Sequence, residues 1–178
     1  MEAAYDKKDF YQSSMFYGTM LGIVWSVMYI LFFAGVKSVM VLILCSMLLF
    51  SSPLFAIAFA RKYRKEVCDD VMNFKQAWIF LFYMYLCASL FSAFIAFIYL
   101  KFIDGGTFFL SLQEILQAGT ELAGTDEVLK QQMQLLTDAA ASITPESFVW
   151  QTLNNNMFNA SVLPIALALF VRKNKKNN

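Results

Sequence analysis

The sequence predicts an all-α fold, in which one integral membrane domain forms a four-helix bundle with a short extracytoplasmic helical cap. Two observations lead to this prediction. Of the 178 residues, 59% are hydrophobic and only 15% are charged, whereas soluble domains contain about 45–50% apolar and about 25% charged residues. The apolar residues also gather in four long uncharged runs, and about 20 such residues are enough for a helix to cross a bilayer.

The four runs place spans at approximately residues 11–35, 37–60, 74–102 and 146–172 of a single membrane domain, residues 1–178. Helix is the expected conformation, because a bilayer cannot satisfy unpaired backbone groups. The first run is longer than the roughly 7–15 apolar residues of a secretory signal, so we interpret it as a retained span. Only Ala34-Gly35-Val36-Lys37 separates the first two runs, which predicts a tight antiparallel hairpin.

Lysine and arginine are distributed unevenly between the two sides of the predicted spans. Eleven of the 14 lie on the side of both chain ends and of a basic and acidic loop at 61–76, and three lie on the other side. Cytoplasmic segments carry the excess of these residues. We therefore expect a multi-pass membrane protein with cytoplasmic N- and C-termini. The net charge of +1 gives no reason to expect nucleic acid as a partner.

Residues 104–145 are predicted to form the extracytoplasmic cap, because apolar residues recur there at helical spacing. Two helix starts are expected within this segment. Thr125-Asp126-Glu127 places acids in a first turn, which suits the positive end of a helix dipole. Thr144-Pro145 combines a favoured N-cap with proline at the first helical position, so the fourth helix should begin there.

Four basic residues follow the second predicted span directly, at Arg61, Lys62, Arg64 and Lys65. Such a cluster next to a bilayer attracts anionic lipid headgroups, by about 1 kcal/mol per residue. Alternatively, the cluster has no role other than to orient the spans in the membrane. Both interpretations make membrane lipids a partner of this surface.

Small residues repeat every four positions in the first three spans, which lets helices approach closely. The ladders serve either packing within the bundle or an interface with another subunit. Their members are Ser14, Gly18, Gly22 and Ser26 in the first span, Ser52, Ala56 and Ala60 in the second, and Ala88, Ser92 and Ala96 in the third.

Two further features lie in the second and fourth spans. Pro53 and Pro164 are predicted to kink their helices, since proline removes a backbone donor. Asn154, Asn155, Asn156 and Asn159 are predicted to form a polar collar near the outer end of the fourth span. A collar of this kind could also bind a polar headgroup or a sugar.

The residue types needed for common catalytic sites are scarce. The chain has no histidine, and no span carries an ionisable residue in its middle, where such residues mark proton relays and ion pathways. Cys45, Cys68 and Cys87 lie in unrelated settings and do not suggest a metal site. We therefore expect no catalytic residue, no metal and no cofactor. The acidic pair Asp69-Asp70 is the one alternative, because paired acids can hold a divalent ion.

The pattern as a whole resembles a known family. The residues that carry the resemblance are Phe16-Tyr17-Gly18 at the start of span one, Arg61-Lys62-Tyr63-Arg64 after span two, the polar helical segment before span four and the short basic tail. Together they resemble the domain-of-unknown-function 4199 family of small bacterial four-span membrane proteins. That family has no established activity. Its genes often lie beside that of a family-2 glycosyltransferase, which implies a link to lipid-linked sugar transfer at the cell envelope.

Three functions are compatible with these observations. The first is a non-enzymatic partner or scaffold subunit for another membrane protein, such as a glycosyltransferase that uses a lipid-linked sugar. The second is a small carrier or lipid-handling protein that works as a homo-oligomer. The third is a membrane enzyme that uses Asp69 and Asp70. The scarcity of catalytic residues favours the first.

Overall fold

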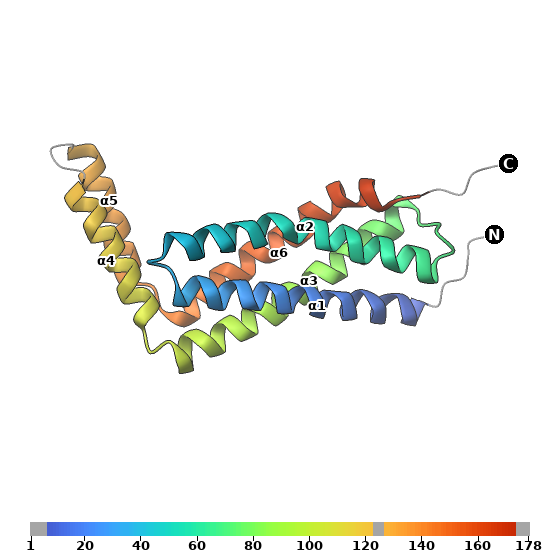
Figure 1. Ribbon diagram of the computed structural model, residues 1–178, viewed down its shortest axis with the longest axis horizontal. Helices are drawn as coiled ribbons and strands as arrows, with labels where there is room; N and C mark the ends of the chain where they lie inside the picture. The colour runs from blue at the N-terminus through green and yellow to red at the C-terminus, as the bar shows by residue number, and fades with distance from the viewer. Residues whose placement is uncertain (1–6, 123–126, 174–178) are drawn as a thin grey trace.

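The computed structural model describes residues 7–122 and 127–173, which fold into six α-helices and one π-helix. Figure 1 shows the long helices side by side, with a shorter helical hairpin at one end and the first and last described residues at the other. The elements are α1 (Lys7–Ala34), α2 (Val39–Val67), α3 (Phe74–Ile98), the π-helix η1 (Tyr99–Ile103), α4 (Thr107–Leu122), α5 (Glu127–Ala141) and α6 (Pro145–Val171). The all-α class is therefore confirmed.

Within the described residues, three helices are long and apolar enough to cross a membrane: α1, α2, and α3 together with η1. The sequence predicted four spans. The fourth, α6, has the length of a span and runs alongside α3, but it does not belong to this group. Its middle contains four asparagines, which lower its mean hydropathy because amides are costly to transfer into hydrocarbon.

Two helix starts follow directly from local sequence. Thr144 caps α6, since its side chain accepts a hydrogen bond from the Ser147 backbone N–H, and Pro145 occupies the first turn, as the sequence predicted. Asn73 and Gln76 form the equivalent capping box at the start of α3. The other predicted start, Thr125-Asp126, lies outside the described residues, and α5 is described from Glu127.

The second helix is longer than its predicted span. It continues to Val67, so the basic cluster lies on its last two turns, and the connection predicted at 61–76 is reduced to residues 68–73. Arg, Lys and Glu are good helix formers, so nothing local ends the helix at Ala60. It ends before Asp69 and Asp70, whose φ angles of 49° and 58° are left-handed, a conformation that Asp tolerates better than most residues.

The most extensive helix contact joins α1 to α3. A Cβ atom built on Gly18 would lie 2.6 Å from the Met84 carbonyl oxygen and 2.8 Å from the Cys87 Cβ. One turn later, a Cβ on Gly22 would lie 3.1 Å from the Phe91 Cβ. All the ladder residues are buried inside the chain's own bundle. The ladders therefore pack the helices of one chain together and are not exposed to a second subunit.

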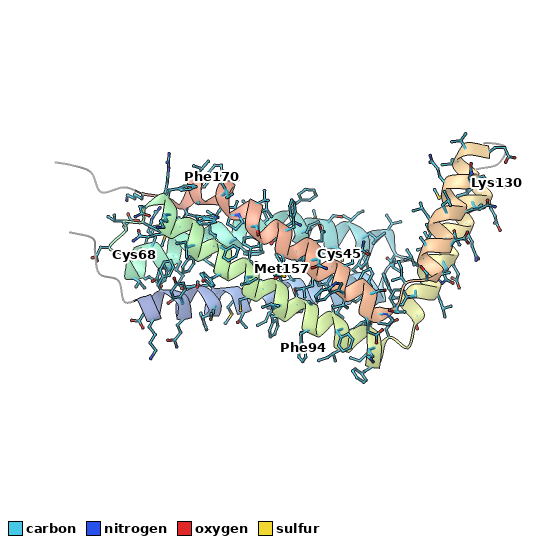
Figure 2. The ribbon with its side chains drawn as sticks, turned by 180° about the vertical axis from the view of Figure 1, so that it is seen from behind. Cys45, Cys68, Phe94, Lys130, Met157 and Phe170 are labelled. Carbon is cyan, nitrogen blue, oxygen red and sulfur yellow. The ribbon has the colours of Figure 1, made fainter. Side chains whose placement is uncertain are left out.

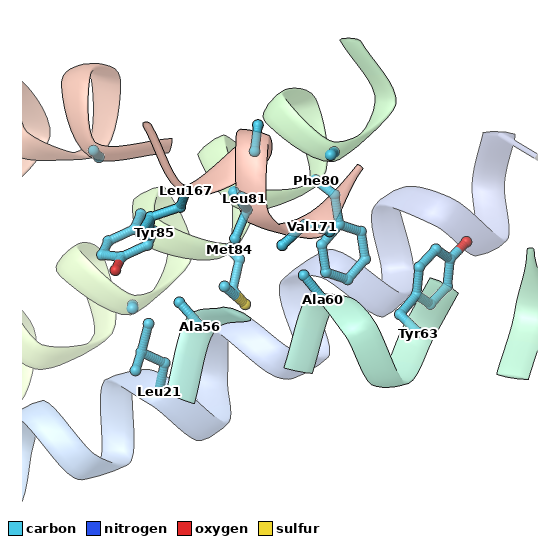
Figure 3. Packing of buried hydrophobic residues seen from close by; sticks show 14 of the residues in the cluster. Leu21, Ala56, Ala60, Tyr63, Phe80, Leu81, Met84, Tyr85, Leu167 and Val171 are labelled. Atoms are coloured by element: carbon cyan, nitrogen blue, oxygen red, sulfur yellow. The ribbon is translucent and has the colours of Figure 1, made fainter. Parts of the chain in front are cut away.

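Two apolar clusters fill the bundle. Figure 3 shows part of the first cluster. The rings of Tyr63 and Phe80 stack there, with 4.6 Å between their centroids. Phe10 packs edge-on against both rings. The second, which we call the outer aromatic cluster, joins the bundle to the hairpin. There Phe33 lies 5.0 Å from Phe108 and 5.9 Å from Phe148, between ring centroids.

A change at Gly18 tests the central contact. Gly18→Val should destabilise the protein by about 1–3 kcal/mol, as overpacking in a tight core does, because the Met84 carbonyl is backbone and cannot rotate away. The free energy of unfolding in detergent, measured by denaturant titration, checks this. Met20→Val, at an exposed position on the same helix, is the control and should change stability little. Equal stability of the two variants would contradict the assigned contact.

Candidate functional site

The basic residues at the end of α2 divide into two groups in the structure. Arg61 donates from Nε and Nη2 to the Phe170 carbonyl, at 3.2 and 3.0 Å. Arg64 is buried, and its Nη1 donates to the Val171 carbonyl. These two arginines therefore bind the last carbonyls of α6, where a positive charge is favoured by the helix dipole. Lys62 and Lys65 are exposed and remain on the surface.

Asp70 completes this arrangement. Its Oδ1 accepts a hydrogen bond from Arg64 Nε at 2.9 Å, and its Oδ2 is paired with Lys173. Lys173 also exchanges two backbone hydrogen bonds with Met72, at 2.8 and 2.9 Å. We call Arg61, Arg64, Asp70 and Lys173 the terminal clasp, because they join α2, the following loop and the end of α6.

The clasp changes two interpretations of the sequence. Arg61 and Arg64 hold the protein together, so the four-residue basic cluster offers mainly Lys62 and Lys65 to lipid headgroups. Both carboxylate oxygens of Asp70 are engaged by Arg64 and Lys173, so the Asp69-Asp70 pair does not present two free carboxylates to a divalent ion. Within the described part of the chain, no three His, Cys, Asp or Glu side chains gather as a metal site would require.

The two prolines lie inside their helices, as predicted, Pro53 in α2 and Pro164 in α6. Pro164 is fully buried, next to Leu167 and Ala168, which belong to the first apolar cluster. This proline is thus part of the bundle core and does not line an open groove.

The four asparagines of α6 do not form a uniform collar. Asn156 turns inward, and its Nδ2 donates to the Tyr29 hydroxyl at 3.0 Å. Asn159 is half-buried, whereas Asn154 and Asn155 are exposed. Asn156 lies about 16 Å from Pro145 at the helical rise per residue, and its partner Tyr29 lies more than a turn inside the end of α1. Asn156 therefore lies about three turns into α6, level with Tyr29 near the end of α1.

Gln151, which begins the polar patch at 151–156 of the sequence, belongs to the same group. Gln151 is exposed, and residues at i, i+3 and i+4 share one face of a helix. Gln151, Asn154 and Asn155 therefore form a continuous row of amides on the outer face of α6, which we call the amide row. The i, i+3, i+4 spacing of amides was the signal that could have identified it. Each amide both donates and accepts hydrogen bonds, so the row can bind polar groups but carries no titratable group.

A buried hydrogen bond was also not foreseen. Trp25 Nε1 donates to Ser52 Oγ at 2.8 Å, between α1 and α2. Ser52 is one of the predicted ladder residues, and the indole donor gives it a role beyond its small size. The ring of Tyr85 packs on Trp25, with 5.7 Å between centroids. This contact joins α3 to the same layer of the bundle.

The clasp predicts a pH dependence of stability. The hydrogen bond from Lys173 and the contact with Arg64 hold the pKa of Asp70 below its usual value. In the unfolded chain the pKa of an Asp side chain is about 3.9. A carboxylate whose pKa is lower in the folded state stabilises the fold at pH values above this unfolded pKa. The stabilisation is lost as the pH falls through the folded pKa. Asp70→Asn should therefore be less stable than wild type at pH 7.

The measurement is the midpoint of thermal unfolding in detergent between pH 7 and pH 3. The difference between wild type and Asp70→Asn should shrink toward the acidic end. Asp69→Asn is the matched control, because Asp69 shares the left-handed backbone of Asp70 and asparagine tolerates that conformation equally well. A difference that stays constant across this range would show that the Asp70 charge does not stabilise the clasp.

Comparison with known proteins places the chain in one family. No curated protein and no solved structure matches it. The family model for proteins of unknown function designated DUF4199 matches residues 16–173, which is well over half of the chain. The match runs from the Phe16-Tyr17-Gly18 segment of α1 to Lys173 of the terminal clasp. The chain therefore belongs to the DUF4199 family, as the sequence resemblance implied.

Proposed function

We propose that this protein is a non-enzymatic, four-span subunit of the bacterial envelope that binds another membrane protein as its partner or scaffold. The amide row on α6 is the observation that carries this proposal. Gln151, Asn154 and Asn155 are exposed on α6, and lipid tails offer an amide no hydrogen bond.

The contacts of α6 support the proposal that it is the fourth span. Three neighbouring helices have the length and apolarity to cross a membrane. α6 lies along α3 and also contacts α2, and its last carbonyls are held by Arg61 and Arg64 at the end of α2. In the proposed arrangement, α6 is held alongside its neighbours and crosses the membrane with them. The amide row then lies inside the bilayer.

Exposing amides at that depth is costly. An amide without a hydrogen-bond partner in an apolar medium costs roughly 2–7 kcal/mol, depending on the reference state. Polar contacts between membrane helices recover about 0.6–2 kcal/mol each. Asn156 avoids the cost by binding Tyr29 within the chain. Asn154 and Asn155, on the outer face, avoid it if a polar side chain of another helix lies against them.

The partner class comes from the family resemblance. A membrane glycosyltransferase that uses a lipid-linked sugar is the partner that the resemblance implies. In the proposed inner-membrane orientation, with both termini cytoplasmic, Lys62 and Lys65 would face anionic headgroups at the cytoplasmic side. The α4–α5 hairpin would then lie on the opposite side.

An alternative function, a small oligomeric carrier or lipid-handling protein, is favoured by the same residues. Because amides are both donors and acceptors, the amide row is self-complementary and also fits a second copy of this chain. In that case the interface would be symmetric, as most homo-oligomer interfaces are.

Purification from native membranes tests the proposal. A tagged chain extracted in a mild detergent should retain one membrane protein reproducibly, as read by quantitative mass spectrometry. Asn154→Leu combined with Asn155→Leu should reduce recovery of that protein by about tenfold, which corresponds to about 1.4 kcal/mol. Val162→Leu, an exposed apolar position on the same helix, should leave recovery unchanged.

Three results separate the possibilities. If the copurifying protein is lost from the double variant but retained by Val162→Leu, the partner function is supported. A second copy of the chain in its place, seen by crosslinking, supports the oligomeric alternative. A wild-type chain that is monomeric and carries no protein with it would overturn both.

The proposed orientation has a separate test. Cys68 follows α2 at the terminal clasp and is half-buried, and burial raises the pKa of its thiol, so it should react slowly with a maleimide. With Cys45 and Cys87 replaced by alanine, a membrane-impermeant maleimide should label Cys68 only after the cytoplasmic side is opened. Ser142→Cys, with Cys68→Ala as well, should be labelled in intact cells. The reverse pattern would invert the orientation.

A further inference from the structure

The α4–α5 hairpin projects sideways from the bundle. Figures 1 and 2 show it at the end opposite the chain termini, at a steep angle to the long helices, with Lys130 near its far end. Gly105 and Gly106, with φ angles of 60° and 87°, make the turn into α4, a conformation that favours glycine. An ion pair between Lys37 and Glu114 also ties α4 to the α1–α2 turn.

Apolar side chains follow one stripe along each helix of the hairpin. In α4 they are Phe108, Ile115 and Leu122, at intervals of seven residues. In α5 and the residues after it they are Leu129, Leu136 and Ile143, at the same interval. Seven residues are close to two helical turns, so each set lies on one face of its helix.

The residues of each stripe that lie nearest the bundle show which way the apolar face points. Phe108 and Ile143 both pack in the outer aromatic cluster, so the two stripes begin on the side that faces the bundle. Farther along the hairpin the same face has no bundle helix beneath it. There Ile115, Leu136 and Leu122 are 40%, 53% and 87% exposed.

The opposite face of the hairpin is polar and is shared by both helices. Its residues border one shallow surface depression: Gln117, Thr120, Glu121, Gln134, Thr137 and Asp138. The hairpin therefore has a water-facing side that is net acidic and an apolar side turned toward the plane of the bundle end.

We propose that the apolar face of the hairpin rests on the lipid surface beside the bundle, as an interfacial amphipathic element. The face begins at the outer aromatic cluster, where Phe108 and Ile143 pack. The ion pair between Glu114 and Lys37 brings α4 close to the start of α2, where Val39 and Met40 are also exposed. Amphipathic helices bury such a face at the boundary between headgroups and acyl chains. Because the polar face is acidic, the association depends on apolar burial and needs no anionic lipid.

This arrangement rests on the membrane insertion proposed above and extends it to a second element. A hairpin resting on the lipid surface would also set how deeply α6 lies in the bilayer. Glu146 in the first turn of α6 is paired with Lys101 of η1 at 2.7 Å, so the hairpin, η1 and α6 meet at one level. A hairpin held on the lipid surface would keep the amide row at a constant depth.

Spin labels placed on the two faces test this inference. In a chain without its three native cysteines, single cysteines at Leu122 and Leu136 report the apolar face, and single cysteines at Glu121 and Gln134 are matched controls on the polar face. A cysteine at Phe50 of α2, which is 78% exposed, reports insertion of the bundle. The labelled proteins are reconstituted in phosphatidylcholine vesicles, and accessibility to oxygen and to a water-soluble nickel chelate is measured by power saturation.

The expected result is that labels at Phe50, Leu122 and Leu136 are reached mainly by oxygen, and labels at Glu121 and Gln134 mainly by the nickel chelate. If Phe50 reports lipid but Leu122 and Leu136 behave like the polar controls, the hairpin stands in water and this inference is overturned alone. If Leu122 and Leu136 are reached by neither reagent, protein covers the face, which also overturns it. A Phe50 label in water would overturn membrane insertion itself.

Discussion

The close approach of α1 and α3 at Gly18 and Gly22 is the contact on which the other helices depend. Lipid tails are as apolar as leucine, so the hydrophobic effect does little to hold membrane helices together, and close van der Waals packing has to do so. A methyl group at Gly18 would already meet the backbone of Met84. With α1 on one side and α6 on the other, α3 becomes the central helix, and α2 is held between α1 and the end of α6.

The polar groups of the bundle are placed according to what each can bind. Arg64 is buried, and a buried guanidinium has to be paired. It binds the end of α6 and Asp70, and Asp70 in turn binds Lys173. At the other end, Asn156 binds Tyr29, and Lys37 binds Glu114. The amides of Asn154 and Asn155 are instead exposed on α6, and their exposure is the physical reason to expect a second protein at that face.

The amide row and the hairpin present different chemistry on the same half of the molecule. The row offers hydrogen bonds at the depth of the bundle, and the hairpin offers apolar surface on one side and acidic surface on the other. If the apolar side meets lipid, the acidic side and the amide row are both left for protein contacts. A partner membrane protein would then be recognised within the bilayer and above it by the same half of the chain.

Much of this arrangement could be predicted from the sequence, because helix length, caps and apolar periodicity are local properties. The tight α1–α2 turn, the Thr144–Pro145 start of α6 and the amphipathic hairpin all follow from residues close together in the chain. Contacts between distant residues were decided only by the tertiary structure. Arg61 and Arg64 meet carbonyls that lie 109 and 107 residues later, a pairing that no local pattern in the sequence indicates.

The inward turn of Asn156 depends on Tyr29, 127 residues earlier, whereas its neighbours Asn154 and Asn155 face outward. Four asparagines of one type were therefore indistinguishable in the sequence. The small-residue ladders show the same limit. Their spacing determined that some helix would approach closely, but the position of α3 decided that the helix belongs to the same chain, because spacing encodes the shape of a surface and not the identity of what covers it.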